Sequence, residues 1–425
     1  MLLTYYGDDF SGSTDVMEAL TLGGVPAVLF LEPPSPEALK RFPECKAVGV
    51  AGVSRSESPE WMAGNLSGVF RALGQIGAPI CHYKVCSTFD SSPTHGSIGK
   101  AVEIGREVFG DGAVPMVVGA PVLRRYVLFA NLFATVEGVS FRIDRHPTMS
   151  RHPVTPMREG DLRVHLAAQT KLATGHVDIL ALQRAEGLER FREEAGRGAE
   201  IVLFDTLDDQ SLREAGRAIW ESKCAFAAGS SGVEYALLAY WREQGMLPAR
   251  PEVRDAGAVD PLLVVSGSCS PRTGEQIEWA MRNGFRCIRV NPSAFDEQSI
   301  CESARTALAR GESVVVYSAA GPGDIVDKPG LQQELGLSLG RLTADLVRSS
   351  GVRRVVVAGG DTSGRVGQAL GITALTMVRP FAPGSPLCRI WAEESWIDGA
   401  EILFKGGQVG GVSLFGEVRA GKPVV

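Results

Sequence analysis

The segment Arg353–Gly371, RRVVVAGGDTSGRVGQALG, contains the clearest strand-to-helix transition in this chain of 425 residues. Its β-branched run Val355–Val357 predicts a buried strand. The chain then turns through Gly359–Gly360, and we expect a helix to start near Thr362. The first amides of a helix have no intrahelical partner and the helix dipole is positive at that end, so such a turn favours an anion. An ordinary βα turn would look the same, because glycine turns are common in α/β proteins.

Asp361 lies inside this turn, where a phosphate would be expected. A carboxylate at such a position makes chemical sense only with a cation to hold or a proton to move. We therefore interpret the turn as half of a phosphoryl-transfer site.

The composition is that of an ordinary globular protein, with 44% hydrophobic and 22% charged residues, and the length predicts two or three domains. The formal net charge of −6 argues against a nucleic-acid partner. Eight cysteines without a CxxC pair indicate reduced thiols rather than a disulfide or zinc framework. The N-terminus does not resemble a signal peptide, and no apolar run approaches the ~18 residues of a membrane helix. We therefore expect a cytoplasmic protein with no membrane partner.

The first predicted strand, Leu2–Tyr6, runs into a turn that is crowded with polar side chains. Helix capping accounts for one of them, because a single serine, threonine or aspartate caps a helix. The carboxyl ends of strands in open α/β sheets are also where ligands bind. We therefore expect a ligand site that includes the six polar residues of this turn, Asp8, Asp9, Ser11, Ser13, Thr14 and Asp15.

Two further predicted strands, Ala47–Val53 and Pro79–Tyr83, carry charged residues toward the same edge of the sheet. Arg55 follows the first strand, and Lys84 and Asp90 follow the second. Two cations beside carboxylates and hydroxyls suit a small, polyhydroxylated, anionic substrate. Solvated ion pairs at loop tips are the alternative, and each would contribute little.

Two later segments of the first half are harder to interpret. Residues 124–134 show no clear helix or strand period. The basic, proline-containing run 142–155 holds His152, which we keep as a candidate for substrate binding. A lone loop histidine is more often only solvated or capped.

The best candidate linker is Gln244–Asp260, where the hydrophobic periodicity breaks and two prolines occur among charged and small residues. We therefore divide the chain into domains 1–247 and 258–425. The second domain has three glycine turns after apolar runs: SGSCS (266–270), AGGDTSG (358–364) and KGGQVG (405–410). If their strands are neighbours, the turns converge on a crevice for a nucleotide. There is no GxxxxGK[ST] and no GxGxxG after a strand, which excludes a P-loop and weakens a dinucleotide interpretation.

The order and spacing of six segments resemble those of the four-carbon acid sugar kinase family over nearly the whole chain. These segments are YGDDFSGSTD, YKVCSTFDSS, HPVTPM, SGSCSPRT, GGDTSG and KGGQVGG. The resemblance implies an α/β fold with two α/β/α domains, the first binding a sugar and the second a nucleotide, with the active site in the cleft between them. It also implies transfer of a phosphoryl group from ATP, with Mg²⁺, to a terminal hydroxyl of an acid sugar such as threonate, erythronate or 3-oxo-tetronate.

The resemblance also implies which residues form the two sites. The implied acid-sugar site consists of Asp8, Asp9, Ser11, Asp15, Arg55, Lys84, Thr88 and Asp90. The implied ATP site consists of Ser266 or Ser268, Gly359, Gly360, Asp361, Thr362 and Gly407. In this hypothesis Arg55 and Lys84 hold the substrate carboxylate or oxo group, and Asp9 is the preferred base. Asp361 remains open as either the base or a metal ligand, and the other metal ligands are unknown.

Several positions depart from the family pattern. Tyr6–Gly7 precedes the aspartate pair, Ser11 and Ser13 replace threonine and alanine, and the last motif differs from the usual KSGNFG. Because these changes affect substrate contacts, a branched or oxidised acid sugar such as 3-oxo-isoapionate stays an alternative. Two other classes also stay open: a non-catalytic sugar-acid-binding protein and an NAD-dependent sugar-acid oxidoreductase. A homodimer is a working assumption only.

Overall fold

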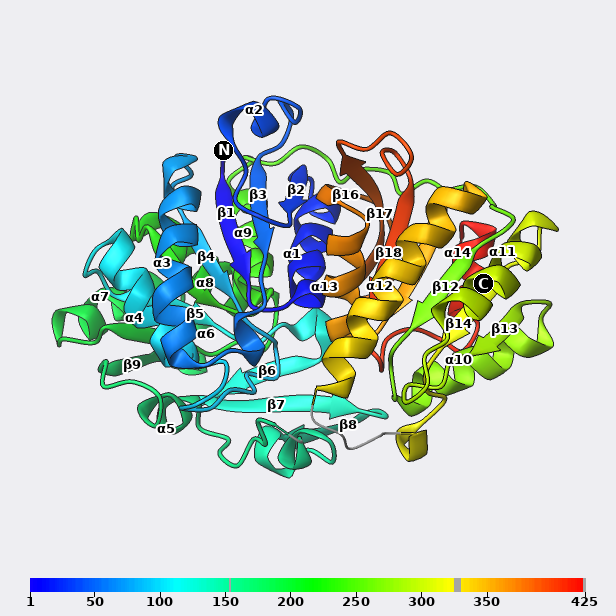
Figure 1. Cartoon of the computed structure of the whole chain (residues 1–425). Helices are drawn as coiled ribbons and strands as arrows, with labels where there is room; N and C mark the ends of the chain where they lie inside the picture. The colour runs from blue at the N-terminus through cyan, green and yellow to red at the C-terminus, as the bar shows by residue number, and fades with distance from the viewer. Residues whose placement is uncertain (153, 325–329, 423–425) are drawn as a thin grey trace. The chain divides into compact units, whose positions relative to one another are not determined.

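The computed structural model describes residues 1–152, 154–324 and 330–422 (Figure 1). The chain forms two compact units. Unit 1 contains Met1–Ala27 and Pro33–Pro251, whereas unit 2 contains Val28–Glu32 and the chain from Glu252 onward. Each unit is a mixed α/β structure built on a largely parallel sheet, so the expected two-domain α/β fold class is confirmed.

The strands of the unit 1 sheet pair in parallel. Residues Gly7, Ala51, Lys84 and Gly229 lie level with one another, so the carboxyl ends of four neighbouring strands meet at one edge. The strand order across the sheet is β3 (Ala47–Ala51), β1 (Leu3–Gly7), β4 (Cys81–Lys84), β11 (Phe226–Gly229), β5 (Val114–Val117), β10 (Ile201–Phe204) and β9 (Thr174–Val177). Parallel neighbours need crossover connections, which helices supply between β3 and β4, β4 and β5, β9 and β10, and β10 and β11.

Helices cover both faces of this sheet. One face packs against α3 (Pro59–Gln75) and α4 (Ile98–Phe109) in a cluster of buried apolar side chains. The other face contacts α1 (Phe10–Leu22) and α9 (Gly232–Glu243). The remaining helices of unit 1 are α2 (Pro36–Leu39), α5 (Leu162–Ala167), α6 (Ile179–Gln183), α7 (Gly187–Gly196) and α8 (Asp209–Glu221), with 3-10 turns η1 (Ser54–Ser56), η2 (Pro121–Leu123), η3 (Ile143–Arg145) and η4 (Met149–Arg151).

Strand β4 shows how the sequence places polar groups inside this unit. Successive side chains of a strand point to opposite faces. Cys81 and Tyr83 therefore join the apolar cluster under α3, whereas His82 and Lys84 point toward α9 and α1. The alternation brings the Lys84 ammonium to the edge where the four strands end.

Residues 124–134, which show no clear period in the sequence, form most of a small antiparallel sheet. Its strands are β6 (Arg125–Leu128), β7 (Asn131–Val136) and β8 (Val139–Arg142). The β6–β7 turn has positive φ at Phe129 and Ala130. The buried carboxylate of Asp205 accepts both of their amides, at 2.7 and 3.0 Å, and so stabilises this turn without a glycine.

The sheet of unit 2 has a parallel part and an antiparallel part. The parallel part has the order β13 (Arg286–Arg289), β14 (Val314–Tyr317), β12 (Leu263–Ser266), β15 (Arg354–Ala358) and β18 (Glu401–Lys405). Antiparallel strands β17 (Ser385–Ala392) and β16 (Ile372–Ala382) follow, and the long hairpin that they form was not predicted from the sequence. Strand β2 (Ala27–Phe30) pairs antiparallel with β16 through Leu29 and Phe30.

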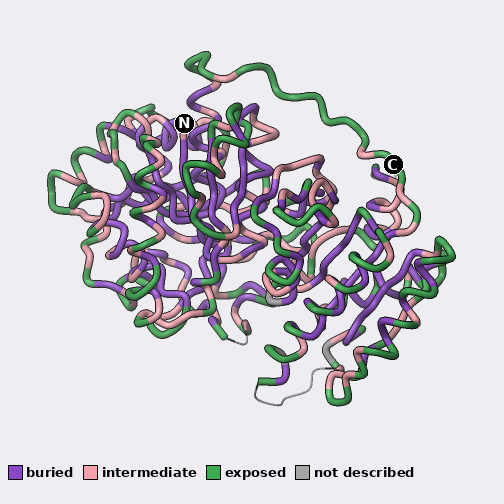
Figure 2. Tube along the Cα trace, turned by 45° about the horizontal axis from the view of Figure 1, so that its top comes forward, coloured by how far each residue is buried: buried purple, intermediate pink, exposed green. Residues whose placement is uncertain are grey.

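Helices also cover both faces of the unit 2 sheet. The apolar cluster on one face includes α10 (Pro271–Arg282) and α14 (Leu414–Ala420), and the other face carries α11 (Glu297–Ala309), α12 (Leu331–Ser350) and α13 (Gly360–Ala369). A 3-10 turn, η5 (Pro322–Asp324), follows β14. Most of the central strands are buried, whereas the predicted linker is exposed along Pro248–Asp255 (Figure 2).

Candidate active site

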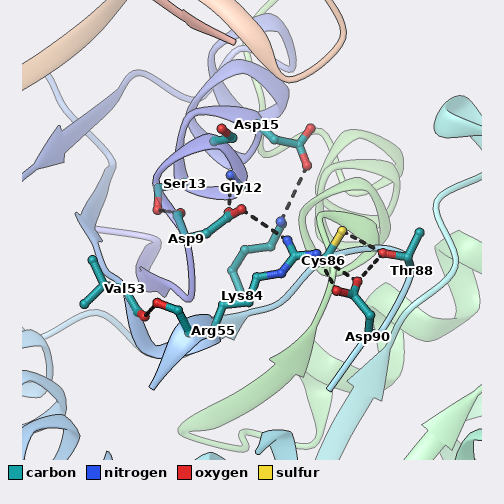
Figure 3. A network of polar contacts seen from close by, with 12 residues as sticks. Asp9, Gly12, Ser13, Asp15, Val53, Arg55, Lys84, Cys86, Thr88 and Asp90 are labelled. Atoms are coloured by element: carbon teal, nitrogen blue, oxygen red, sulfur yellow. Dashed lines mark hydrogen bonds and ion pairs between the residues drawn. The ribbon is translucent and has the colours of Figure 1, made fainter. Parts of the chain in front are cut away.

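A cluster of charged side chains lies where β1, β3 and β4 end in unit 1 (Figure 3). The strand ends place these groups together because the strands are parallel neighbours in register. We call this group the aspartate cluster; its members are Asp8, Asp9, Asp15, Arg55, Lys84 and Asp90.

Asp9 caps helix α1, and both of its carboxylate oxygens are occupied. The Gly12 amide donates to Oδ1 at 2.6 Å, and Arg55 Nη1 donates to Oδ2 at 3.1 Å. Gly12 is needed here, because a Cβ at that position would lie 2.5 Å from Asp9 Oδ1 and 3.0 Å from Lys84 Nζ. Asp9 therefore positions the start of α1 and the guanidinium of Arg55.

Arg55 and Asp90 form a fixed ion pair. Arg55 Nη2 donates to both carboxylate oxygens of Asp90, at 2.8 and 2.7 Å, and Thr88 Oγ1 donates to Oδ1 at 2.5 Å. Burial alone would raise the pKa of Asp90, but Arg55 and Thr88 outweigh it and lower that pKa. Asp90 is therefore a carboxylate at neutral pH, and the charge of Arg55 is already used by the protein.

Lys84 is buried and lies beside Asp15, with 3.7 Å between Nζ and Oδ2. Burial would lower the pKa of Lys84, but the nearby carboxylates, Asp15 first among them, raise it instead. Lys84 thus stays charged and is also partly neutralised within the protein.

Asp8 differs from the other carboxylates of the cluster. It is buried, and its Oδ1 has no hydrogen-bond partner among the described residues. Burial, reinforced by the neighbouring Asp9, raises the pKa of Asp8 to about 7. A carboxyl group with such a pKa can accept a proton from a substrate hydroxyl near neutral pH.

The other predicted residues of the first site lie close by. Ser11 is half-buried in the first turn of α1. His152 is linked to the cluster through Thr155, whose amide donates to His152 Nδ1 at 3.0 Å and whose hydroxyl donates to Asp90 Oδ2 at 3.3 Å. Two neighbours were not proposed from the sequence, although the quoted motifs contain them: Thr155, and Cys86, whose Sγ accepts from Thr88.

Unit 2 has a separate pocket of about 270 Å³ at the carboxyl ends of β12, β15 and β18. We call it the glycine pocket. Three neighbouring strands deliver the three glycine turns to it, and α12 closes one side with apolar residues. The lining includes Gly267, Ser268, Cys269, Ser318, Leu331, Leu335, Gly336, Gly359, Gly360, Thr362 and Gly407.

The pocket exists because side chains are missing from its turns. A Cβ on Gly267 would lie 2.2 Å from Thr362 Oγ1, and one on Gly407 would lie 2.7 Å from Ser268 Oγ. Gly359 has a φ of 118°, which favours glycine. It precedes α13, whose start has no capping side chain, so first-turn amides are available for an anion.

Five residues predicted for the nucleotide, Ser268, Gly359, Gly360, Thr362 and Gly407, line this pocket. Ser266 is buried beneath it and accepts a hydrogen bond from the Ser268 amide at 3.3 Å. Asp361 lies in the first turn of α13, but its side chain is outside the described part of the structure.

Lys405 was not proposed as a site residue. Its side chain is fully buried at the end of β18, and Nζ donates to Thr273 Oγ1 at 2.9 Å and to the Gly407 carbonyl at 3.4 Å. No carboxylate within the described ranges pairs with it, and burial lowers its pKa to about 7. A buried ammonium beside the turn that lines the pocket is well placed to respond to an anion.

Two features are absent from the described residues. No helix in the described ranges is long and apolar enough to span a bilayer. No group of three or more His, Cys, Asp or Glu side chains in the same ranges has the geometry of a metal site.

Comparisons with known proteins agree with this division of sites. Residues 3–237 match the family model of a sugar-binding N-terminal domain, and residues 263–415 match that of a nucleotide-binding C-terminal domain. A 3-oxo-isoapionate kinase from Paraburkholderia graminis is 48% identical, covering 99% of this chain and 95% of that protein. A 3-oxo-tetronate kinase from Cupriavidus necator is 30% identical, and the match covers 98% of this chain and 96% of that protein. The crystal structure of a Salmonella typhimurium LT2 protein has the same fold, with a TM-score of 0.78, 23% identity and coverage of 99% and 98%.

A sugar-binding unit followed by a nucleotide-binding unit defines a class of sugar kinases. This chain belongs to the four-carbon acid sugar kinase family. The sequence-based expectation of an ATP-using kinase of acid sugars is thereby confirmed.

Proposed function

We propose that this protein transfers the γ-phosphoryl group of ATP to a hydroxyl of a 3-oxo acid sugar, with 3-oxo-isoapionate as the first choice. The 48% identical relative carries that substrate in its name, whereas relatives near 30% identity are 3-oxo-tetronate kinases. A 3-oxo-tetronate is therefore the second candidate. We assign sugar binding to residues 1–247 and nucleotide binding to residues 258–425.

The observation that carries this proposal is that Asp8 is buried and that its Oδ1 has no hydrogen-bond partner among the described residues. An attacking hydroxyl must lose its proton as its oxygen bonds to phosphorus and the bond to the β-phosphate oxygen breaks. Asp8 has an unpartnered oxygen and a pKa of about 7, so it can take that proton. Asp9 was the preferred base in the sequence-based hypothesis, but both of its oxygens already accept hydrogen bonds. We therefore assign Asp8 as the base and Asp9 as a positioning residue.

The remaining members of the aspartate cluster bind and orient the substrate hydroxyls. Asp90 is held ionised by Arg55, and Asp15 lies beside the charged Lys84. Carboxylates accept hydrogen bonds from sugar hydroxyls, whereas Arg55 and Lys84 donate to hydroxyl or oxo oxygens. A polyhydroxylated substrate therefore finds both donors and acceptors in one small space.

The glycine pocket suits ATP. Bare turns, the Ser268 and Thr362 hydroxyls and the start of α13 favour phosphates, while Leu331 and Leu335 offer an apolar surface to a base. Mg²⁺ commonly binds through phosphates, waters and only one or two carboxylates, which fits a pocket with no cluster of ligands among its described residues. When bound together with ATP, the Mg²⁺ ion would neutralise negative charge on the phosphates. Asp361 and Thr362 are the candidates to hold it.

A coupled assay of ADP release tests the proposal directly. Purified protein is incubated with Mg·ATP and, separately, 3-oxo-isoapionate, 3-oxo-tetronate, threonate and erythronate. We expect turnover, with the highest kcat/KM for 3-oxo-isoapionate. No ADP release with any of them, or NADH formation with NAD in place of ATP, would contradict a kinase.

The proposal also covers the compartment and the oligomeric state of the protein. Dependence on ATP and eight free cysteines suit the cytoplasm. The homodimer remains an assumption, which light scattering of the purified protein checks.

A further inference from the structure

The aspartate cluster does not explain how the substrate's own carboxylate is bound. Its four carboxylates, Asp8, Asp9, Asp15 and Asp90, face only two cations, and each cation is engaged by a protein carboxylate. With all four carboxylates ionised the cluster has a net charge of about −2, and burial raises the pKa of both Asp8 and Asp15. Adding another carboxylate beside it would be unfavourable unless a further cation is near.

Arg125 provides a further cation at the same edge of unit 1. It is the first residue of β6, and its amide donates to the Ala120 carbonyl at 3.2 Å, just after β5 ends. Strand β5 pairs with β11 and β11 pairs with β4, so the chain reaches Arg125 from the edge where Lys84 lies. Arg125 was not proposed from the sequence, because residues 124–134 show no clear helix or strand period.

The Arg125 guanidinium is not neutralised by the protein. Its Nη1 donates to three main-chain carbonyls, those of Leu123, Arg124 and Thr135, at 3.1, 3.2 and 3.3 Å. No carboxylate of the described residues lies within ion-pair distance, and the buried Nε has no partner. Burial lowers the pKa of this arginine, as expected for a partly desolvated charge without a counter-ion. A guanidinium without a protein carboxylate can bind a ligand carboxylate through two parallel hydrogen bonds.

The electrostatic neighbours of Arg125 connect it to the aspartate cluster. Burial lowers the pKa of Arg125 and the nearby Cys86 opposes that shift. The same thiol accepts a hydrogen bond from Thr88, which also donates to Asp90. His146 is the other neighbour. Its Nδ1 accepts the amides of Thr148 and Met149, and burial together with Arg125 lowers its pKa, so it stays neutral.

We propose that Arg125 binds the carboxylate of the acid sugar through its guanidinium group, while the aspartate cluster binds the hydroxyls. This assignment rests on the proposed function and identifies the residue that selects an acid over a neutral sugar. It replaces the sequence-based hypothesis in which Arg55 and Lys84 hold that carboxylate.

The test compares Arg125→Met with Arg124→Met, using 3-oxo-isoapionate and its neutral carboxamide. Arg124 is the adjacent, exposed arginine, which makes it a matched control. We expect Arg125→Met to raise KM for the acid roughly 10- to 100-fold, with KM for ATP unchanged and the carboxamide unaffected. Arg125→Lys should lose less, because it keeps the charge but not the two-pronged geometry. Arg124→Met should behave as the unmodified protein does.

Isothermal calorimetry of both ligands separates this inference from the proposed function. If the unmodified protein binds the acid but never phosphorylates it, the kinase assignment fails, whereas Arg125 is still tested by the loss of binding. An unchanged acid affinity in Arg125→Met, or an equal loss in Arg124→Met, would overturn the inference. If circular dichroism shows Arg125→Met unfolded, Arg125→Gln decides by the same criteria, because its uncharged amide keeps two N–H donors for the main-chain carbonyls.

Discussion

The aspartate cluster and the glycine pocket differ in how the protein builds them: the first from charged side chains, the second from turns that lack side chains. The cluster gathers charged side chains that fix one another, so that Arg55 holds both Asp9 and Asp90. The glycine pocket lacks side chains at its turns, so that main-chain groups line it. The buried Lys405 donates to the carbonyl of Gly407, which is one of its lining residues. The aspartate cluster therefore depends on the positions of its charged groups, and the glycine pocket depends on the volume left free at its turns. Substitutions that change charge and substitutions that add volume should separate the two.

The largest effect is expected for Asp8→Asn, which removes the proposed base and preserves shape. We expect kcat to fall about 100- to 10,000-fold with little change in either KM. Asp9→Asn is the matched control and should lose only about tenfold, because asparagine still caps α1. In the unmodified protein, kcat/KM should fall as pH drops below about 7, where Asp8 becomes protonated. Equal losses in the two variants would contradict the assignment of Asp8.

Gly267→Ala should come next, since its Cβ would lie 2.2 Å from Thr362 Oγ1. We expect KM for ATP to rise roughly 10- to 100-fold, as overpacking of this size costs about 1–3 kcal/mol, with acid-sugar affinity unchanged. Gly364→Ala, in α13 with no atom near the added Cβ, is the control. Acid-sugar binding that weakens as much as ATP binding would argue against a local effect.

Lys405 offers a smaller effect that depends on pH. Its pKa of about 7 means that it is charged below pH 7 and neutral above. Nucleotide affinity, measured by calorimetry, should therefore rise as pH falls from 8 to 6, and Lys405→Met should weaken binding about tenfold at pH 6 but little at pH 8. The exposed Lys422→Met is the control. A Lys405→Met variant with the unmodified pH dependence would exclude Lys405 from anion binding.

The smallest effect is on stability. Folding raises the pKa of Asp8 from 3.8 to about 7, so the folded state keeps a proton that the unfolded state releases, and the free energy of unfolding falls as pH rises across that interval. Asp8→Asn should thus raise the melting temperature at pH 8, by about 2–4 °C, and have less effect at pH 4. A melting temperature lowered at pH 8 would show that Asp8 stabilises the fold.

The sequence was informative where a local rule decides the structure. A β-branched run followed by Gly359 and Gly360 produced a strand and a turn, and parallel strands then had to bring their ends together. The partners of each charge were not readable, because they depend on distances between segments. The sequence favours Asp9 as the base, but it does not reveal that each oxygen of Asp9 accepts a hydrogen bond, from Gly12 and from Arg55.

The segment with Arg125 shows a different reason for failure. A two-residue hairpin turn with positive φ usually contains Gly or Asn, and here it contains Phe129 and Ala130. Asp205, far along the chain, replaces that local signal by binding both amides. No reading of neighbouring residues can find a turn that is stabilised from such a separation. Strand β2 is similar, because its partner β16 lies more than three hundred residues away in the sequence.

The membership of Val28–Glu32 in unit 2 has a practical outcome for anyone dissecting this enzyme. Cutting the gene at the linker would not release two intact halves. A fragment from Glu252 onward would expose the bare edge of β16 at Ala374 and Leu375, which β2 normally pairs, and unpaired strand edges invite aggregation. A fragment ending at Pro251 would contain β2 without its partner strand β16. Separate expression therefore calls for grafting residues 28–32 onto the second half.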